Sequence, residues 1–258
     1  MLGAIAGDII GSVHEHRPIK HTDFPLFTAR STWTDDSLLT VAVADALLHG
    51  KSFAESLYDW GSRYPHAGFG RSFIQWLKGG GGEPYGSWGN GSAMRVSPVA
   101  WAFDDEASVL AAATESAAAT HDHPEGIKGA RAVALAIFMA RQGADKPAIR
   151  ERIQSTFEYD LKRTLEEIRP GYRFDVSCAG SVPEALIAFL ESSDYESAVR
   201  NAISLGGDAD TQACIAGSVA EAFYGGVPET IASQAHARLP VEMGRILEAF
   251  ARRYGEGL

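Results

Sequence analysis

Hydrophobic residues recur at the spacing of one helix face along most of the chain. The pattern is clear over residues 35–48, where the apolar positions include Leu38, Leu39, Ala42 and Ala46. Residues 174–178 are compatible with a short strand, but no series of alternating strand positions and no regular repeat is present. The sequence therefore predicts an all-α fold, with residues 1–258 in a single domain. The predicted helices span residues 35–48, 107–120, 130–140, 183–190, 196–205, 212–224 and 241–254.

Local signals support several of these helix boundaries. A hydroxyl residue followed three positions later by Glu predicts a capping box, in which the two side chains satisfy free backbone N–H groups at a helix start. Proline is tolerated at a helix start because its missing N–H would have no partner there, and glycines commonly follow a helix end. The signals are Ser52 with Glu55, Ser181 with Glu184, Pro183, and the pair Gly206 and Gly207.

Composition narrows the class of protein. The chain has 40 alanines and 27 glycines, a mixture that favours closely packed helices joined by glycine-rich loops. The hydrophobic share of 45% excludes general disorder, and the net charge of −10 argues against nucleic-acid binding. Two cysteines are too few for a disulfide framework, and no apolar run approaches the roughly 20 residues of a membrane span. Residues 1–12 lack the basic segment of a signal peptide, so a cytoplasmic location is expected.

Two short acidic motifs stand at predicted helix starts. One is Thr34-Asp35-Asp36, and the other is Asp208-Ala209-Asp210-Thr211, which follows two glycines. If the motifs converge, their four carboxylates would raise one another's pKa values unless a cation lay between them. Oxygen ligands without His or Cys select Mg²⁺, Mn²⁺ or Ca²⁺, and four carboxylates suffice for two such ions. Either motif taken alone is more typical of a helix N-cap, whereas two motifs of matching composition favour a metal site, so the pattern leaves both interpretations open.

A glycine-rich segment is the second candidate binding element. Seven of the thirteen residues from Gly79 to Gly91 are glycine, with Tyr85 and Trp88 among them. Glycines let backbone N–H groups approach an anion closely, and the aromatic rings offer stacking surfaces. The segment contains neither a Walker A motif nor a dinucleotide-binding fingerprint. A flexible surface loop whose Trp88 packs on the core is the alternative.

Four further polar residues have structural interpretations. His121 follows a predicted helix, where it would interact favourably with the C-terminal dipole. In an extended stretch the side chains of His121 and His123 would point apart, so they are not expected to share a metal. Glu15, between two histidines, is expected to be an exposed carboxylate. Glu166 and Glu167 are expected on a solvated helix face.

Several motifs taken together resemble the ADP-ribosylglycohydrolase family, which includes the dinitrogenase-reductase-activating glycohydrolase and the ADP-ribosyl-acceptor hydrolases. The matches appear in family order over residues 3–226. They are the segments 3–8 and 11–15, Thr34-Asp35-Asp36, Gly89-Asn90-Gly91-Ser92-Ala93-Met94-Arg95, Thr120-His121, and Gly206 to Thr211.

The resemblance implies a compact helical fold with a cleft that holds two Mg²⁺ or Mn²⁺ ions. It implies that these ions are bound by Thr34, Asp35, Asp36, Asp208, Asp210 and Thr211. It assigns catalytic roles to Glu15, Asp35 and Asp210, although the histidines beside Glu15 depart from the family's usual aromatic-Glu pattern. The substrate-binding residues that it implies are Gly68, Gly70, Gly86, Ser87, Trp88, Gly89, Asn90, Gly91, Met94 and His121.

The implied reaction is hydrolysis of the bond between C1″ of the distal ribose of ADP-ribose and an acceptor, with Glu15 or a cluster aspartate moving the proton. The substrate would be an ADP-ribosylated protein or small molecule, and the acceptor is left open between arginine, serine, a nucleobase and a metabolite. The oligomeric state is also open, a monomer included. Two alternatives remain: an ADP-ribose-binding module without turnover, and a metal-dependent hydrolase of another nucleotide-like substrate.

Overall fold

The structure is a computed structural model that describes residues 1–255. These residues form helices and loops without a β-strand, which confirms the predicted all-α fold. The expected strand over 174–178 is only one isolated bridge between Ser177 and Gly89. The helices are α1 Leu2–Gly11, α2 Asp35–His49, α3 Phe53–Arg63, α4 Arg71–Lys78, α5 Gly91–Met94, α6 Ser97–Ala102, α7 Glu106–Ala118, α8 Pro124–Arg141, α9 Lys146–Phe157, α10 Leu165–Ile168, α11 Cys178–Leu190, α12 Tyr195–Ile203, α13 Ala209–Tyr224, α14 Glu229–His236 and α15 Val241–Tyr254.

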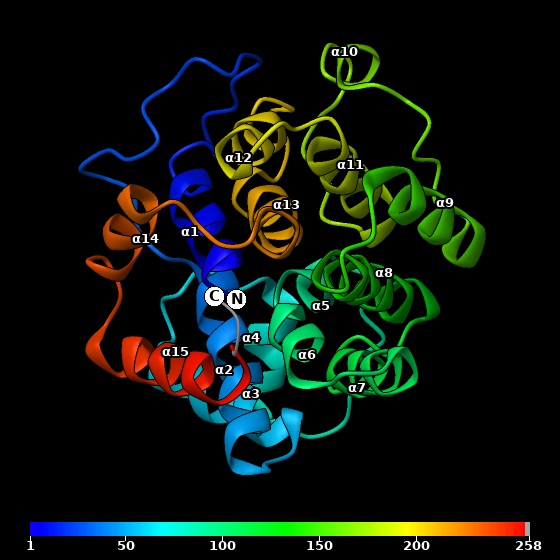
Figure 1. Cartoon of the computed structure of the whole chain (residues 1–258). Helices are drawn as coiled ribbons and strands as arrows, with labels where there is room; N and C mark the ends of the chain where they lie inside the picture. The colour runs from blue at the N-terminus through cyan, green and yellow to red at the C-terminus, as the bar shows by residue number, and fades with distance from the viewer. Residues whose placement is uncertain (256–258) are drawn as a thin grey trace.

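Helix α13 forms the centre of the molecule. Every residue from Ala209 to Glu221 is buried, and Figure 1 shows α1 beside this helix, with α14 and α15 toward one side and α7, α8 and α9 toward the other. Small side chains allow this close packing, because an alanine-rich helix surface lets neighbouring backbones approach. The starts of α2 and α13 both lie in this central region, so the fold brings together two segments far apart in sequence.

Helix α1 was not predicted, because glycine disfavours an isolated helix. Its glycines Gly3, Gly7 and Gly11 recur every fourth residue and face α13. A methyl group on Gly7 would lie 2.1 Å from the carbonyl oxygen of Ala213. The absence of side chains on this face of α1 therefore lets the two helix backbones touch, and tertiary contact overrides the poor intrinsic propensity.

Most predicted helices are present with shifted ends. The prediction for α15 is confirmed as made, and α2 extends one residue further than expected. Helix α8 begins earlier, at Pro124, with the His123 side chain accepting the N–H of Glu125 at 3.1 Å. At α3, the Ser52 hydroxyl accepts the N–H of Glu55 at 3.1 Å, which confirms that half of the predicted capping box.

The predicted capping box at Ser181 is wrong. Helix α11 begins at Cys178, where the hydroxyl of the N-cap residue Ser177 accepts the N–H of Gly180 at 2.9 Å. Pro183 consequently lies inside the helix rather than at its start. Its ring removes the N–H that would bond to the carbonyl of Ala179, and that residue is exposed, so water can solvate the carbonyl.

Three expectations from the sequence concern disulfides, membrane spans and the exposure of two glutamates, and residues 1–255 bear on each. Neither Cys178 nor Cys214 forms a disulfide, and both are buried. No helix in the described part of the chain is both long enough and apolar enough to cross a membrane. Glu166 and Glu167 are exposed on α10, as expected.

Candidate functional site

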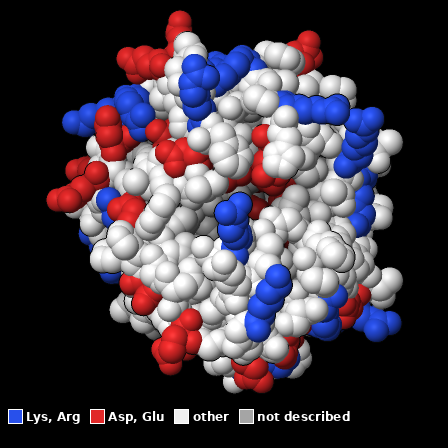
Figure 2. Space-filling model, turned by 180° about the vertical axis from the view of Figure 1, so that it is seen from behind, with Lys and Arg blue, Asp and Glu red and all other residues white. Residues whose placement is uncertain are grey.

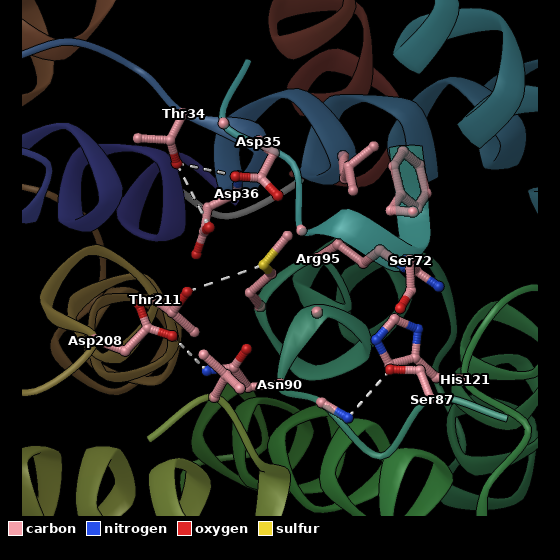
Figure 3. A pocket seen from close by; sticks show the side chains of 18 of the residues that line it. Thr34, Asp35, Asp36, Ser72, Ser87, Asn90, Arg95, His121, Asp208 and Thr211 are labelled. Carbon is pink, nitrogen blue, oxygen red and sulfur yellow. Dashed lines mark hydrogen bonds between the residues drawn. The ribbon is translucent and has the colours of Figure 1, made fainter. Parts of the chain in front are cut away.

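One cavity of about 550 Å³ lies where the starts of α2 and α13 meet α4, α5 and the glycine-rich segment. Figure 2 shows the face of the molecule that is hollowed, with acidic side chains inside the hollow and basic side chains beside it. Figure 3 shows the acidic residues at one end of the cavity, with Ser87 and His121 at the other. A volume of this size suits a ligand larger than a single sugar.

Asp8 of α1 holds the start of α2 in place. Its carboxylate accepts hydrogen bonds from the Thr34 N–H at 3.0 Å, the Thr34 hydroxyl at 2.7 Å and the Ser37 N–H at 3.1 Å, and also from the Ser37 hydroxyl. Burial raises the pKa of Asp8 to about 6, although these hydrogen bonds oppose the shift. Sequence reasoning did not assign Asp8 to the site. The available signal was its place directly after Gly7, in one of the motifs shared with the family.

The start of α13 carries the second acidic group. Asp208 is its N-cap residue, and its carboxylate accepts a hydrogen bond from the Asn90 amide at 2.8 Å. Asp210, in the first turn, accepts the N–H of Thr211 at 3.0 Å. Met94, on α5, lines the same cavity, and its sulfur accepts a hydrogen bond from the Thr211 hydroxyl at 4.0 Å.

The structure brings the two acidic motifs together. Carboxylate oxygens of Asp8, Asp36 and Asp210 lie within 4.8 Å of one another, and so do those of Glu15, Asp208 and Asp210. Asp35 lines the same cavity but belongs to neither group. The expectation of an exposed Glu15 is wrong, because its side chain is 29% exposed and faces the α13 carboxylates.

Burial and, after it, neighbouring like charges raise the pKa values of this cluster. Burial, followed by the charge of Asp8, raises the pKa of Asp35 from 3.8 to about 8. Burial and neighbouring carboxylates also hold the pKa values of Asp36 and Asp210 well above the usual range. No Lys or Arg is among the main causes of these three pKa shifts.

The cluster fits a divalent metal centre. The Oδ1 atom of Asp36 is buried and has no hydrogen-bond partner, which is costly unless a cation binds it. All the donors are carboxylate and hydroxyl oxygens, the set that Mg²⁺ and Mn²⁺ prefer. An N-cap role alone, the alternative for each motif, leaves this unpaired oxygen and the convergence of five carboxylates unexplained.

The glycine-rich segment forms the wall at the other end of the cavity, and several of its amides are already used. Gly86, at φ +65°, donates its N–H to Asp122 at 2.7 Å, Gly89 donates to the Ser87 hydroxyl at 3.2 Å, and Asn90 donates to the carbonyl of Val176 at 2.8 Å. Among residues 1–255, the N–H groups of Ser87, Trp88 and Gly91 have no acceptor. The amides open to an anion are therefore fewer than the sequence indicated.

Apolar side chains form the mouth of the cavity. Trp88, Phe174 and Val176 line it and are 51%, 52% and 44% exposed. Large hydrophobic side chains are rarely exposed together without a partner, so this rim is a candidate ligand contact. The interpretation of Trp88 as a core residue is therefore wrong. Sequence reasoning missed Phe174 and Val176, because a loop that approaches the cavity from another part of the chain gives no local signal.

His121 lies inside the cavity wall rather than at an exposed helix end. The residue is 6% exposed, and burial together with the charge of Arg95 lowers the pKa of its ring well below 6.5. A neutral imidazole gains little from the dipole of α7, so that interpretation is wrong. Gly68 and Gly70 also line the cavity, so every site residue proposed from the sequence surrounds it.

A helical protein with a carboxylate-rich cavity of this kind is suited to bind divalent metal ions. A family model described as ADP-ribosylglycohydrolase matches residues 1–257. The chain belongs to the ADP-ribosylglycohydrolase family.

Individual relatives agree with this assignment. The chain is 27% identical to "ADP-ribosylhydrolase ARH3" of Danio rerio, over 87% of this chain and 81% of that protein. It is 29% identical to "ADP-ribosylarginine hydrolase Tri1" of Pseudomonas putida, over 87% of this chain and 69% of that protein. A solved structure titled "ADP-ribosylglycohydrolase-related protein complex" superposes with a TM-score of 0.71 at 26% identity and covers 97% of this chain and 96% of that one.

Proposed function

We propose that the protein is a metal-dependent hydrolase that cleaves the bond between C1″ of the distal ribose of ADP-ribose and an acceptor, releasing ADP-ribose. The observation that carries the proposal is the buried, unpaired Asp36 oxygen within a converged carboxylate cluster, at one end of a cavity whose other end offers free amides and aromatic surface. The names of the relatives and the family membership support the same activity. The substrate is an ADP-ribosylated protein or small molecule, handled by a single domain in the cytoplasm.

Two Mg²⁺ or Mn²⁺ ions would be held by Asp36, Asp208 and Asp210, together with Thr34, Asp35 and Thr211, which line the same end of the cavity. When bound, such ions supply Lewis-acid chemistry, orienting ribose hydroxyls and lowering the pKa of a water molecule. Asp8 would act as a positioning residue, because both of its carboxylate oxygens accept hydrogen bonds from Thr34 at the start of α2.

Glu15 is suited to accept the proton of the attacking water. It lies within 4.8 Å of Asp208 and Asp210 and is the carboxylate of this group that stays partly exposed. A partly exposed carboxylate is able to pass its proton to solvent, which a fully buried one cannot do as readily. With metal ions bound, Asp35 and Asp210 would be ionised, and their negative charge would favour the positive charge that develops on the ribose in the transition state.

The remainder of ADP-ribose would occupy the other end of the cavity. The free N–H groups of Ser87, Trp88 and Gly91 would hold the diphosphate, and the exposed Trp88 ring would stack on the adenine. Gly68, at φ +105°, lies against Asp35, since a methyl group there would be 3.3 Å from its Oδ1 atom, and this leaves room for the distal ribose. The acceptor then leaves through the open side of the cavity.

The activity is tested with defined ADP-ribosyl linkages. Metal-loaded protein is incubated with arginine-, serine-, nucleobase- and metabolite-linked ADP-ribose, and free ADP-ribose is measured by chromatography. We expect release from at least one linkage and none from simple phosphoesters. Release from no linkage, with ADP-ribose nevertheless bound, would identify a binding module instead.

Removing the metal is expected to abolish hydrolysis and to lower the melting temperature. A site filled at 100 times its dissociation constant contributes about 2.7 kcal/mol, so two sites give about 5 kcal/mol and roughly 10 °C for a chain of this size. Calorimetry and ADP-ribose release are measured in chelator and again after Mg²⁺ or Mn²⁺ is added back. Activity that persists in chelator, with an unchanged melting temperature, contradicts the metal centre.

Replacing Trp88 by Ala is expected to weaken substrate binding with little change in kcat. Loss of a base–aromatic stack costs about 1–3 kcal/mol, which corresponds to a KM roughly 5- to 100-fold higher. Trp88→Tyr keeps an aromatic face and serves as the matched control, with a KM close to that of the unmodified protein. Steady-state kinetics distinguish the two, and equal KM values for Ala and Tyr would place the adenine elsewhere.

A further inference from the structure

Three buried side chains form a hydrogen-bonded row that ends at the cavity wall. The Arg95 guanidinium is fully buried, and its Nη2 atom donates to the carbonyl of Ser116 at 3.0 Å and to the hydroxyl of Thr120 at 2.8 Å. The Thr120 hydroxyl oxygen lies 2.7 Å from Nδ1 of His121. Thr120 is itself fully buried, so water does not compete for these bonds.

The direction of these hydrogen bonds follows from what each group can donate. A guanidinium has donors only, so the Thr120 oxygen must accept from Arg95. The single hydroxyl proton of Thr120 is then directed to the atom at 2.7 Å, Nδ1 of His121. From this geometry we infer that Arg95 and Thr120 are positioning residues that hold His121 in the tautomer with its proton on Nε2, which makes His121 a hydrogen-bond donor to the ligand and not a base.

The opposite arrangement leaves a buried proton without a partner. If Nδ1 of His121 carried the proton, Thr120 would accept from both His121 and Arg95, and its own hydroxyl proton would need another acceptor. The alternative acceptor is the Tyr85 hydroxyl. Burial raises the pKa of Tyr85 and the nearby Thr120 hydroxyl opposes this rise, but the two hydroxyls are not joined at normal hydrogen-bond distance and angle within residues 1–255, whereas Nδ1 of His121 lies at 2.7 Å. An unsatisfied buried donor costs about 1–3 kcal/mol, which favours the Nε2–H tautomer by roughly 5- to 100-fold.

The Nε2 atom of His121 faces the region that a ligand would occupy. A methyl group on Gly91 would lie 3.0 Å from Nε2, and one on Gly89 would lie 3.7 Å away, and both glycines line the cavity. Nδ1 is occupied by Thr120, whereas Nε2 takes part in none of the hydrogen bonds among residues 1–255. Figure 3 shows His121 beside Ser87, away from the carboxylates.

A positive charge on His121 is also opposed by its surroundings. Arg95 is the charged group nearest to the ring along this row, and no carboxylate forms a hydrogen bond or ion pair with Arg95 among residues 1–255. The ring is thus neutral, with its one free lone pair committed to Thr120. If the proposed function holds, on which this role rests, Nε2–H donates to a diphosphate or ribose oxygen of ADP-ribose.

The tautomer is tested directly by NMR on the full chain carrying ¹⁵N-labelled histidine. Two-bond ¹H–¹⁵N correlations distinguish a protonated from an unprotonated ring nitrogen, and the spectrum of His121→Gln identifies the His121 signals among the eight histidines. We expect an unprotonated Nδ1 and a protonated Nε2 from about pH 6 to about pH 8. A protonated Nδ1, alone or together with Nε2, overturns the inference without any variant.

Two variants of Thr120 test whether its hydroxyl sets the tautomer of His121. Thr120→Val removes the hydroxyl with little change of shape, and we expect both His121 tautomers to become populated and ADP-ribose to bind about 5-fold more weakly. Thr120→Ser restores the hydroxyl and is expected to restore both the single tautomer and the affinity. A Thr120→Val spectrum identical to that of the unmodified protein shows that Thr120 does not set the tautomer.

The donor role has its own comparison. The amide nitrogen of Gln reaches the position of Nε2, whereas that of Asn reaches only the position of Nδ1, so His121→Gln is expected to bind ADP-ribose about 5-fold more tightly than His121→Asn. Equal affinities overturn the donor role. Failure of the proposed function is read separately, as the absence of ADP-ribose release by the unmodified protein, and it leaves the NMR result intact.

Discussion

Replacing Asp36 by Asn is expected to abolish hydrolysis while making the metal-free protein more stable. Asp36 belongs to the converged cluster, and its Oδ1 atom is buried and has no hydrogen-bond partner among the described residues. Burial and the charges of Asp8 and Asp35 raise its pKa well above the usual range, so folding without metal forces this group to hold a proton or to keep an unfavourable charge. An amide of the same shape removes that cost and is able to donate to the neighbouring carboxylates.

The size of this gain follows from the protonation balance. A carboxyl with an unfolded pKa near 3.9 that must be protonated in the folded protein at about pH 7.5 costs up to about 5 kcal/mol, so a gain of several kcal/mol is expected for Asp36→Asn. For a chain of this length that corresponds to roughly 5–15 °C in melting temperature. Calorimetry in chelator measures the gain. The stabilisation that the unmodified protein gains from Mg²⁺ or Mn²⁺ should largely disappear in the variant.

Asp45 provides the matched control on the same helix. It is also buried, and burial raises its pKa, but hydrogen bonds from the Trp60 indole at 3.1 Å and the Lys51 ammonium at 3.0 Å outweigh burial, so the net pKa is lowered. Asp45→Asn is therefore expected to lose about 1–3 kcal/mol while its response to metal is unchanged. A metal-free Asp36→Asn protein that is destabilised like Asp45→Asn would show that Asp36 is a structural group and not a metal ligand.

The metal-free protein should also lose stability as the pH rises. The folded pKa of Asp35 is about 8, and those of Asp8 and Asp208 are about 6, all above the ordinary value of 3.8. A group whose pKa is raised by folding contributes its full stability below about pH 4 and loses it as the pH rises through the folded pKa. Melting curves in chelator are therefore expected to shift downward between about pH 4 and about pH 8, less steeply in Asp36→Asn.

The sequence predicted the two acidic motifs well because each is local. The N-cap signals of α2 and α13 lie within a few residues of the carboxylates they place, so helix starts and candidate ligands came from the same pattern. Glu15 and Asp8 depend instead on which helix lies against which, and no local pattern of charges carries that information. Phe174 reaches the cavity from a loop without regular structure, so periodicity could not indicate it.

Glycine caused the largest omission in the predicted fold. Intrinsic propensity counts Gly3, Gly7 and Gly11 against a helix, yet their spacing is what allows α1 to form against α13. The error at Ser181 has a related origin, since Pro183 was placed by local preference at a helix start, whereas packing extends α11 back to Cys178. Where backbones touch, tertiary packing decides the element, and a single sequence does not display it.

That close packing leads to the second large expected effect, in which Gly7→Ala strongly destabilises the protein. The added methyl group would lie 2.1 Å from the carbonyl oxygen and 2.5 Å from the carbonyl carbon of Ala213, and 2.9 Å from the backbone nitrogen of Cys214. These are backbone atoms in the middle of α13, so relief requires the two helices to separate. Overpacking of this kind costs about 3 kcal/mol or more, against a gain of at most about 1 kcal/mol in helix propensity.

The same substitution at Gly244 is the control, because a methyl group there contacts nothing within 4 Å on α15. Gly244→Ala is expected to raise stability by about 0.5–1 kcal/mol, so the two variants should shift the denaturation midpoint in opposite directions. Gly7 also directly precedes Asp8, and the carboxylate of Asp8 lies within 4.8 Å of that of Asp210 on α13. Separating the two helices therefore moves Asp8 away from Asp210. Gly7→Ala protein that remains folded should bind Mg²⁺ or Mn²⁺ more weakly. Unchanged stability and metal affinity in Gly7→Ala would mean that the contact between α1 and α13 does not set the geometry of the carboxylate cluster.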